Sequence, residues 1–283
     1  MDQANSRAAA PRTSDWPFFA SFAVLGGAYV ALIVAMVLAD IFFTSPRHIF
    51  QALASPEIRY AIRLSLISCS ITAMLSLLVA IPLGYLLARC EFRGRAFIEA
   101  VLDIPIVLPP LVVGLSLLIL FQLKLGGASL ETRLTQIGFP VTYQIPAVVL
   151  AQFAVSAAFA VRTMRVSFEQ LNPRAEQVAL TLGCTRAQAF WRVALPEARR
   201  GVLTAATLAW ARALGEFGPI LVFAGTTRMR TEVLSTTVFL ELSVGKIEAA
   251  VAVSLLMIAA AALVLALMRL FGSEAKFNRA SRP

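Results

Sequence analysis

Charged residues are scarce in this chain of 283 residues. Lys, Arg, Asp and Glu together make up 14% of it, whereas hydrophobic residues make up 59%. Soluble globular domains carry roughly 25% charged residues, so this composition indicates a membrane protein. Lysine occurs three times, and no Gly-x-x-x-x-Gly-Lys-[Ser/Thr] phosphate loop is present. We therefore expect that this chain binds no ATP itself.

Residues that ligate metals or perform catalysis are also few. The chain has one histidine and three cysteines, Cys69, Cys90 and Cys184, which form no spaced cluster. We expect no structural disulfide, no metal site, no cofactor on this chain and no catalytic residue. The net charge of +9 would suggest a nucleic-acid partner for a soluble chain. Membrane topology explains it here, and we expect no nucleic-acid partner.

Long apolar runs are what the chain has in abundance. A helix of about 20 apolar residues crosses the hydrocarbon core of a membrane, and lipid leaves no other way to satisfy the backbone hydrogen bonds of these runs. The sequence predicts an all-α integral membrane protein, with a six-helix transmembrane domain over 18–272 and polar tails at 1–17 and 273–283. The six predicted spans are approximately 18–42, 61–88, 99–121, 144–167, 201–226 and 247–271.

The distribution of basic residues predicts the orientation. If both termini are cytoplasmic, sixteen Lys and Arg residues lie inside or at the inner ends of spans, eight lie outside or at the outer ends, and Arg212 alone lies deep within a span. Cytoplasmic segments carry the excess of positive charge in membrane proteins. We therefore expect a multi-pass protein of the bacterial cytoplasmic (inner) membrane with both termini in the cytoplasm. The basic loop from Arg89 to Arg95 is interpreted as a topogenic clamp.

One predicted cytoplasmic loop is unusually helix-prone. Asn172 can cap a first short helix with Pro173 at its first position, and Gly183 suits a left-handed C-terminal cap. Thr185 and Gln188 have the spacing of a capping box for a second helix, which Pro196 is expected to end. Helices this short need a surface to pack on. That surface is a partner protein or the membrane interface, and a DNA-binding helix-turn-helix is the remaining alternative.

The residues of this loop resemble the EAA motif of ABC importer permeases. That motif is Glu-Ala-Ala, three residues, Gly, nine residues, Ile, one residue, Leu-Pro. Here it stands as Gln177-Val178-Ala179, Gly183, Val193 and Leu195-Pro196, so the spacing is kept but Gln replaces Glu. The resemblance implies that the first short helix is a coupling helix seated in a groove of the ATP-hydrolysing subunit. The residues expected to make this contact are Glu176, Gln177, Val178, Ala179, Leu182, Gly183 and Pro196.

The same resemblance implies the fold and the partners. It implies a permease like those of type I ABC importers, assembled as a homodimer in membrane lipid. Two ATP-binding cassette subunits, which bind ATP and Mg²⁺, would sit below this dimer. An extracytoplasmic substrate-binding protein would deliver the cargo from above. The chain itself would be the membrane subunit of an ATP-hydrolysing transport complex and would not be an enzyme.

Two features within the spans are candidates for the translocation pathway. Arg212 and Glu216 lie deep in the predicted fifth span and are four residues apart, so they can form an ion pair on one helix face. This pair either stabilises helix packing or lies beside an anion pathway, with Gly215 allowing the helix to bend. The third span contains Pro105, Pro109 and Pro110, which obstruct a regular helix. This irregular backbone is either a packing kink or part of the pore lining.

The cargo is predicted from resemblance alone. The segment from Arg212 through Gly225 to "TEVLSTTVFLEL", with "LPPLVVG" upstream, is similar to the molybdate and tungstate branch of these permeases. The sulfate and thiosulfate branch is closely related. We expect import of a tetrahedral oxyanion by alternating access. The alternatives are a sulfate or thiosulfate ABC permease, a secondary transporter driven by an ion gradient, and a membrane scaffold.

Overall fold

The computed structural model describes residues 16–125 and 127–280, without the side chains of 17, 125, 267, 268 and 270–280. Contacts divide the chain into two units, 1–45 and 46–283, which we describe separately. The first unit contains α1 (Trp16–Phe43), whose 18-residue window is entirely unburied within the chain. The predicted N-terminal tail lies outside the described residues up to position 15.

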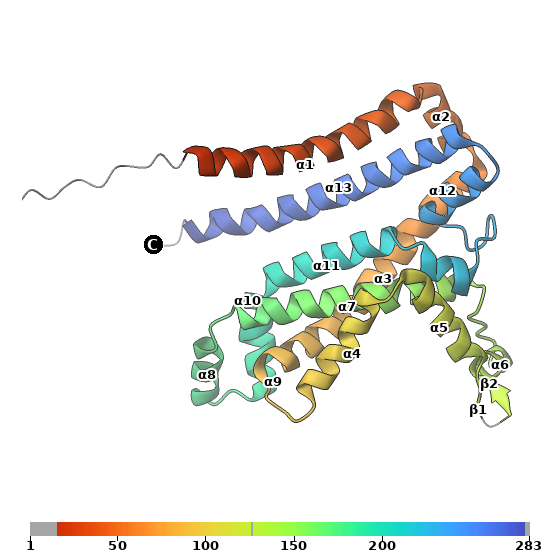
Figure 1. The fold of residues 1–283 in the computed structure, drawn as a ribbon. Helices are drawn as coiled ribbons and strands as arrows, with labels where there is room; N and C mark the ends of the chain where they lie inside the picture. The colour runs from red at the N-terminus through yellow and green to blue at the C-terminus, as the bar shows by residue number, and fades with distance from the viewer. Residues whose placement is uncertain (1–15, 126, 281–283) are drawn as a thin grey trace, which may run out of the picture. The chain divides into compact units, whose positions relative to one another are not determined.

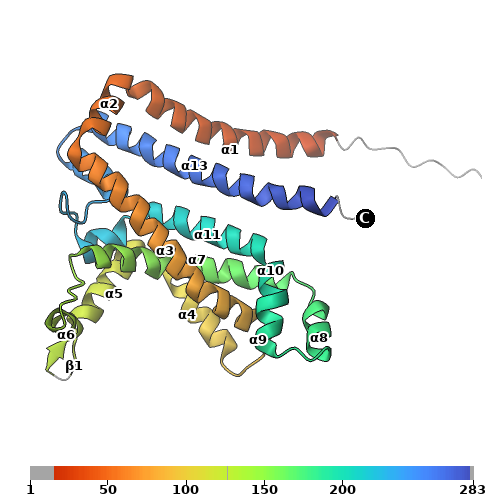
Figure 2. The same ribbon diagram turned by 180° about the vertical axis from the view of Figure 1, so that it is seen from behind.

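The second unit is helical apart from one short hairpin (Figure 1). Its elements run in the order α2 (Pro46–Ala54), α3 (Pro56–Arg89), α4 (Arg95–Val107), α5 (Pro110–Gln122), β1 (Lys124–Leu125), β2 (Ala128–Ser129), α6 (Leu130–Gln136), α7 (Ile145–Glu169), α8 (Arg174–Thr181), α9 (Arg186–Ala189), a π-helical turn η1 (Phe190–Ala194), α10 (Leu195–Glu197), α11 (Arg199–Leu214), a second π-helical turn η2 (Ile220–Ala224), α12 (Leu234–Ser243) and α13 (Ile247–Ala280). Strands β1 and β2 pair antiparallel. The helix α8 and the helix α6 lie at opposite ends of this unit in both views (Figures 1 and 2).

The core of the second unit is formed by α3, α7 and α11. The buried positions of α3 are mostly small, including Ala61, Ala73, Ala80 and Gly84, which recur at helical spacing. Small residues let helices approach closely, which matters in lipid because no hydrophobic effect drives helices together there. A Cβ atom at Gly84 would come within 2.7 Å of Met164 Cβ on α7. Glycine is therefore required where these two helices cross.

A buried glutamine joins the three core helices. Gln152 of α7 is 1% exposed. Its Oε1 accepts a hydrogen bond from the Thr72 hydroxyl of α3 at 3.1 Å, and its Nε2 donates to the Ala213 carbonyl of α11 at 3.2 Å. Both ends of the amide are thus satisfied, as a polar group away from water requires.

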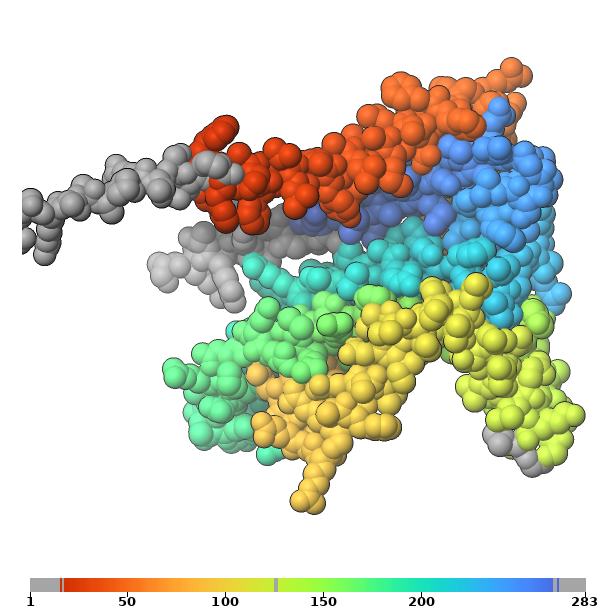
Figure 3. Space-filling view, viewed as in Figure 1, coloured from red at the N-terminus to blue at the C-terminus, as the bar shows by residue number. Residues whose placement is uncertain are grey.

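Within the described residues, four helices are long and apolar enough to cross a membrane. They are 18–43, 56–89, 145–169 and 247–266, which correspond to the first, second, fourth and sixth predicted spans. The predicted third span is bent: α4 and α5 meet at 113° and together count as a fifth crossing only if the bent pair is one span. Figure 3 shows the hollow between the two arms of this bend. The bend falls at Leu108–Pro109, where proline removes the backbone donor that a continuous helix needs.

The predicted span at 201–226 is also not one continuous helix. Helix α11 ends at Leu214, and a turn leads into the π-helical turn η2. Gly215, Gly218 and Pro219 lie in this break, where two glycines weaken the helix and proline cannot continue its hydrogen bonds. At the other end of the chain, the backbone of α13 continues to Ala280, so the predicted tail at 273–283 is helical over most of its length.

Candidate functional site: the α8 surface and the central break

The loop around α8 folds largely as its capping residues predict. Asn172 Oδ1 accepts a hydrogen bond from the Arg174 amide at 3.0 Å and so caps the start of α8. Gly183 adopts the left-handed conformation after the helix, with φ of +91°. Thr185 and Gln188 form the predicted capping box at the start of α9.

The prediction that Pro196 ends the second helix is wrong. The segment passes from α9 through the π-helical turn η1 into α10, and Pro196 lies inside α10. In η1 the Leu195 amide donates to the Phe190 carbonyl, five residues earlier. A widened turn of this kind changes the hydrogen-bonding register just before the proline, which relieves the conflict between its ring and the preceding turn.

Helix α8 presents apolar side chains outward. Val178 is 56% exposed and Leu182, directly after the helix, is 80% exposed. Gln177 and Gly183 are exposed beside them, whereas Ala179 is buried. We call the exposed residues Gln177, Val178, Leu182 and Gly183 the α8 surface. Exposed apolar patches rimmed by polar groups are typical of protein or membrane contacts.

Glu176 faces the opposite way, into the protein. Its Oε1 accepts a hydrogen bond from Arg89 Nε at 3.1 Å and forms an ion pair with Arg89 Nη2 at 2.9 Å, and its Oε2 accepts from the Tyr85 hydroxyl at 2.8 Å. The side chains of Arg89 and Glu176 are 16% and 11% exposed. Arg89 also donates to the Leu171 carbonyl at 3.2 Å. Glu176 therefore fastens α8 to the end of α3.

This anchor differs from the sequence-based expectation, which placed Glu176 on the partner-facing side. Tyr85 and Arg89 are four residues apart on α3, so one helix face carries both donors. This spacing of two hydrogen-bond donors is the sequence signal that could have indicated an anchor for a carboxylate at the end of α3. Within α8, Glu176 and Ala179 are three residues apart and share the buried face, while Val178 faces away.

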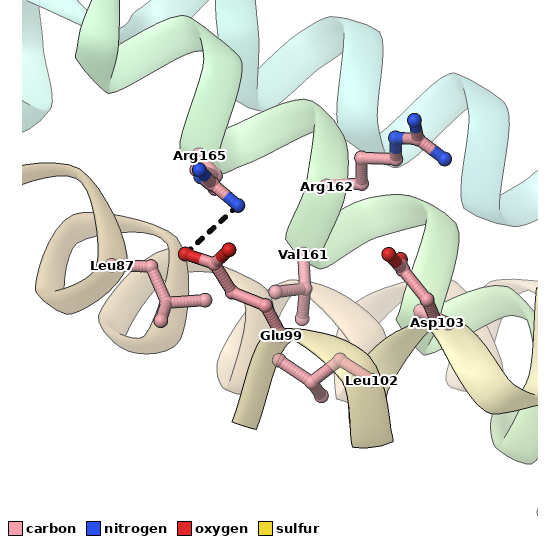
Figure 4. Close-up of a pocket in the computed structure, with 8 residues that line it drawn as sticks. Leu87, Glu99, Leu102, Asp103, Val161, Arg162 and Arg165 are labelled. Atoms are coloured by element: carbon pink, nitrogen blue, oxygen red, sulfur yellow. Dashed lines mark ion pairs between the residues drawn. The ribbon is translucent and has the colours of Figure 1, made fainter. Parts of the chain in front are cut away.

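Four charged side chains join α4 to α7 near α8. Arg165 Nη1 of α7 lies 3.0 Å from Glu99 Oε1 of α4, as Figure 4 shows. Arg95 pairs with Glu99 at 2.8 Å and with Glu169 at 3.7 Å, and Arg165 also pairs with Glu169 at 2.8 Å. Two of the three basic residues of the predicted clamp, Arg89 and Arg95, thus form ion pairs with glutamates.

The central break contains the deep arginine that the sequence singles out. Arg212 Nη1 lies 2.6 Å from Glu216 Oε1, so the expected ion pair forms. The side chain of Arg212 is 30% exposed, whereas that of Glu216 is 1% exposed. The guanidinium carbon of Arg212 lies 5.6 Å from the centroid of the Phe159 ring on α7. Glu216 thus compensates the charge of Arg212 from the buried side, while part of the Arg212 side chain remains exposed.

The start of α5 lines the same break. A groove of about 280 Å³ is bordered by Arg212, Gly215 and Glu216 on one side and by Pro109, Pro110 and Leu111 on the other. A Cβ atom at Gly218 would lie 2.9 Å from the Leu111 amide nitrogen, so glycine permits this close crossing. Pro105 lies inside α4 and is not among the groove residues. A helix N-terminus carries partial positive charge, so Arg212 and the α5 start together favour an anion.

Broken helices whose irregular backbone borders a groove are a feature of membrane transport proteins. The model of the family "binding-protein-dependent transport system inner membrane component" matches residues 80–276. The chain belongs to this family and is a permease subunit of an ABC importer.

Curated relatives are similar over most of the chain. The molybdate/tungstate transport system permease protein WtpB of Pyrococcus abyssi is 34% identical over 207 residues, which are 72% of this chain and 76% of that protein. The molybdenum transport system permease protein ModB of Mycobacterium tuberculosis is 36% identical over 213 residues, 75% and 79% of the two chains. The sulfate transport system permease protein CysT of Escherichia coli is 32% identical over 216 residues, 76% and 77% of the two chains.

The fold is similar to that of a solved ABC importer. A chain in the crystal structure of a bacterial ABC transporter that imports the acidic polysaccharide alginate superimposes with a TM-score of 0.71 at 19% identity. The similarity covers 92% of this chain and 96% of that chain. It extends the fold assignment to nearly the whole length of the permease.

Proposed function

We propose that this permease imports a tetrahedral oxyanion, molybdate or tungstate, through the central break. The observation that supports an anionic cargo is the groove at Arg212, where a partly exposed guanidinium and the first turn of α5 border the same space. Charged groups at membrane depth are costly and usually mark a pathway or a paired structural site. Both members of this pair border the groove, but the side chain of Arg212 is 30% exposed and that of Glu216 is 1% exposed, so the guanidinium is the more accessible charge.

The relatives support the choice of cargo. Proteins named for molybdate and tungstate transport are 34% and 36% identical to this chain. The sulfate permease at 32% identity makes sulfate the second candidate. All of these ions are tetrahedral dianions of similar shape, so the groove residues are suited to the class, and a binding protein would supply the finer selection.

The α8 surface is the proposed contact with the ATP-hydrolysing subunits. Val178 and Leu182 expose apolar area that an eight-residue helix cannot bury alone. In this proposal Gln177, Gly183 and the exposed ring of Pro196 lie at or beside the contact, and Ala179 packs behind it. Glu176 acts as a positioning residue: it holds α8 against α3, so that a movement of α8 is passed to the core helices.

The proposed assembly is a homodimer with two ATP-binding cassette subunits on the cytoplasmic side and an extracytoplasmic binding protein on the other. A structure of the alginate transporter contains its periplasmic binding protein, and it covers 94% of this chain with a TM-score of 0.70. In this proposal α8 and both termini face the cytoplasm. ATP closes the two cassette subunits, the α8 helices move together, and the central break opens toward the binding protein.

Uptake by the complete complex tests this function. Labelled molybdate, tungstate and sulfate are offered, each with its binding protein, to proteoliposomes that contain the permease and its ATP-binding subunit. We expect uptake that requires enclosed ATP and is strongest for molybdate or tungstate. Strongest uptake of sulfate would identify sulfate, the second candidate, as the cargo. Uptake by the permease alone, driven by an ion gradient, would establish a secondary transporter and refute the proposed mechanism.

A further inference from the structure

A second polar groove lies between α7 and α11, closer to α8 than the central break. Its volume is about 440 Å³. The two helices approach closely because Gly201 of α11 faces Ser167 of α7, and a Cβ atom at Gly201 would overlap that serine. The groove is lined by side chains from both helices, chiefly Arg162, Thr163, Ser167, Arg200 and Thr204.

The two arginines of this groove are the unusual feature. Arg162 and Arg200 are both exposed, and neither forms an ion pair with any residue that the structure describes. Arg89, Arg165 and Arg212 each have a glutamate partner, whereas Arg199 resembles Arg200 in being exposed and outside the ion pairs of the described residues, but it does not line the groove. Asp103 of α4 lines a neighbouring pocket with Arg162, but no ion pair joins them. Figure 4 shows Arg165 directed at Glu99, while Arg162 extends away from that carboxylate.

The hydroxyl groups of the groove do not offset this positive charge. Thr163, Ser167 and Thr204 each donate to a backbone carbonyl four residues earlier on their own helix, at 2.9, 2.7 and 2.9 Å. Their hydrogen atoms are therefore already used. The donors left over in the groove are the two guanidinium groups and the side-chain amide of Gln170. The guanidinium groups suit an anion with several oxygens because each offers a planar fork of N–H groups.

The position of the groove relates it to the central break. Helices α7 and α11 run antiparallel, and the contact between Ser167 and Gly201 fixes their register. Counting from this contact, Arg162 lies about six residues from Arg212 toward α8, and Arg200 lies about six residues further. At 1.5 Å per residue these steps are about 9 Å each. Three arginines thus lie at successive levels along α7 and α11, from the central break toward α8: Arg212, Arg162 and Arg200.

We propose that Arg162 and Arg200 form a binding site for a tetrahedral dianion on the α8 side of the central break. Resting on the proposed function, this site holds the oxyanion after it leaves Arg212 and before its release. The phosphate of an anionic lipid headgroup has the same recognition chemistry, so the test must distinguish a free oxyanion from a lipid.

A cysteine reporter in the groove provides the test. Thr204→Cys is introduced into a chain in which Cys90 and Cys184 are replaced by serine, since the third cysteine, Cys69, is buried. The full complex is placed in nanodiscs of phosphatidylcholine. The rate at which an uncharged maleimide modifies the reporter is measured as molybdate or sulfate is added.

We expect the anion to slow the modification. Arg162→Gln and Arg200→Gln each remove hydrogen bonds to a charged ligand, so each should raise the half-protecting anion concentration about tenfold. The double variant should lose protection. Arg199→Gln is the matched control, because Arg199 is exposed next to Arg200 but is not among the groove residues.

The remaining outcomes distinguish a free oxyanion from a lipid phosphate, and they distinguish failure of this site from failure of the proposed function. Protection that appears only in phosphatidylglycerol nanodiscs, and that disappears in the double variant, would assign the site to a lipid phosphate and overturn its role in cargo release. No protection in either membrane would overturn the site itself. The labelling needs neither ATP nor uptake. Normal ATP-driven oxyanion uptake without protection would therefore reject this inference and leave the proposed function standing.

Discussion

Replacing Glu176 by Gln isolates the anchor between α8 and α3. The substitution keeps the size of the side chain and removes its charge. In the native protein this carboxylate accepts hydrogen bonds from Arg89 Nε and from the Tyr85 hydroxyl and forms an ion pair with Arg89 Nη2, at 2.8 to 3.1 Å. The amide of the Glu176→Gln variant would offer one acceptor oxygen in place of two and would leave the Arg89 guanidinium without a counter-charge.

The size of the effect follows from burial. Removing one partner of a fully buried ion pair costs about 3–5 kcal/mol, and exposed pairs contribute about 0–1 kcal/mol. The two side chains here are 16% and 11% exposed, and glutamine retains part of the hydrogen bonding. We therefore expect a loss of about 2 kcal/mol in the free energy that holds α8 against α3. This corresponds to about a thirtyfold rise in the undocked population of α8.

Hydrogen–deuterium exchange measures this population. The reconstituted permease is compared with the Glu176→Gln variant over residues 174–182, and we expect exchange of α8 amides to accelerate about thirtyfold. The matched control is Glu197→Gln, because Glu197 is exposed and forms no ion pair with a described residue. ATP hydrolysis by the complex should continue in the Glu176→Gln variant while uptake per ATP falls. Unchanged α8 exchange in that variant would refute the anchor.

Three further substitutions test the loop around α8 and the central break. Gly183→Val forces a β-branched residue into φ of +91°, so α8 should be destabilised by about 1–2 kcal/mol and uptake should fall; unchanged uptake would exclude a need for this turn. Arg212→Gln should abolish oxyanion uptake in a complex that still assembles on size-exclusion chromatography, and normal uptake would remove Arg212 from the pathway. Gly218→Ala places a Cβ atom 2.9 Å from the Leu111 amide, so thermal unfolding in detergent should show a loss of about 1–3 kcal/mol; an unchanged midpoint would contradict the close crossing.

The caps in the loop around α8 could be predicted because their hydrogen bonds join residues that are close in the sequence. Gly183, Thr185 and Gln188 interact within a few residues of each other, so their spacing alone indicates the turn and the cap. The course of the chain beyond them was less predictable. Pro196 normally stops a helix, but the π-helical turn before it lets the helix continue, and no residue type specifies that turn reliably.

The long-range contacts could not be derived from one sequence. The apolar runs indicate the membrane class, but the 113° bend between α4 and α5 depends on how Gly114 and Gly218 pack against the opposite segment. The orientation of Glu176 likewise depends on Arg89, which is 87 residues earlier in the chain. A pattern of period 3.6 places residues on one face of a helix. It does not say which face meets the protein and which meets a partner.

We propose that a separate ATP-hydrolysing subunit binds the α8 surface. A photo-reactive amino acid at position 182 tests it directly, with one at position 137 as the control. Leu182 and Ile137 are similarly exposed, at 80% and 76%, and directly follow α8 and α6, which lie at opposite ends of the second unit (Figures 1 and 2). In transport-active complexes we predict crosslinks to the ATP-binding subunit from position 182 and none from position 137. Active complexes that crosslink from position 137, or that never crosslink from position 182, would contradict the account.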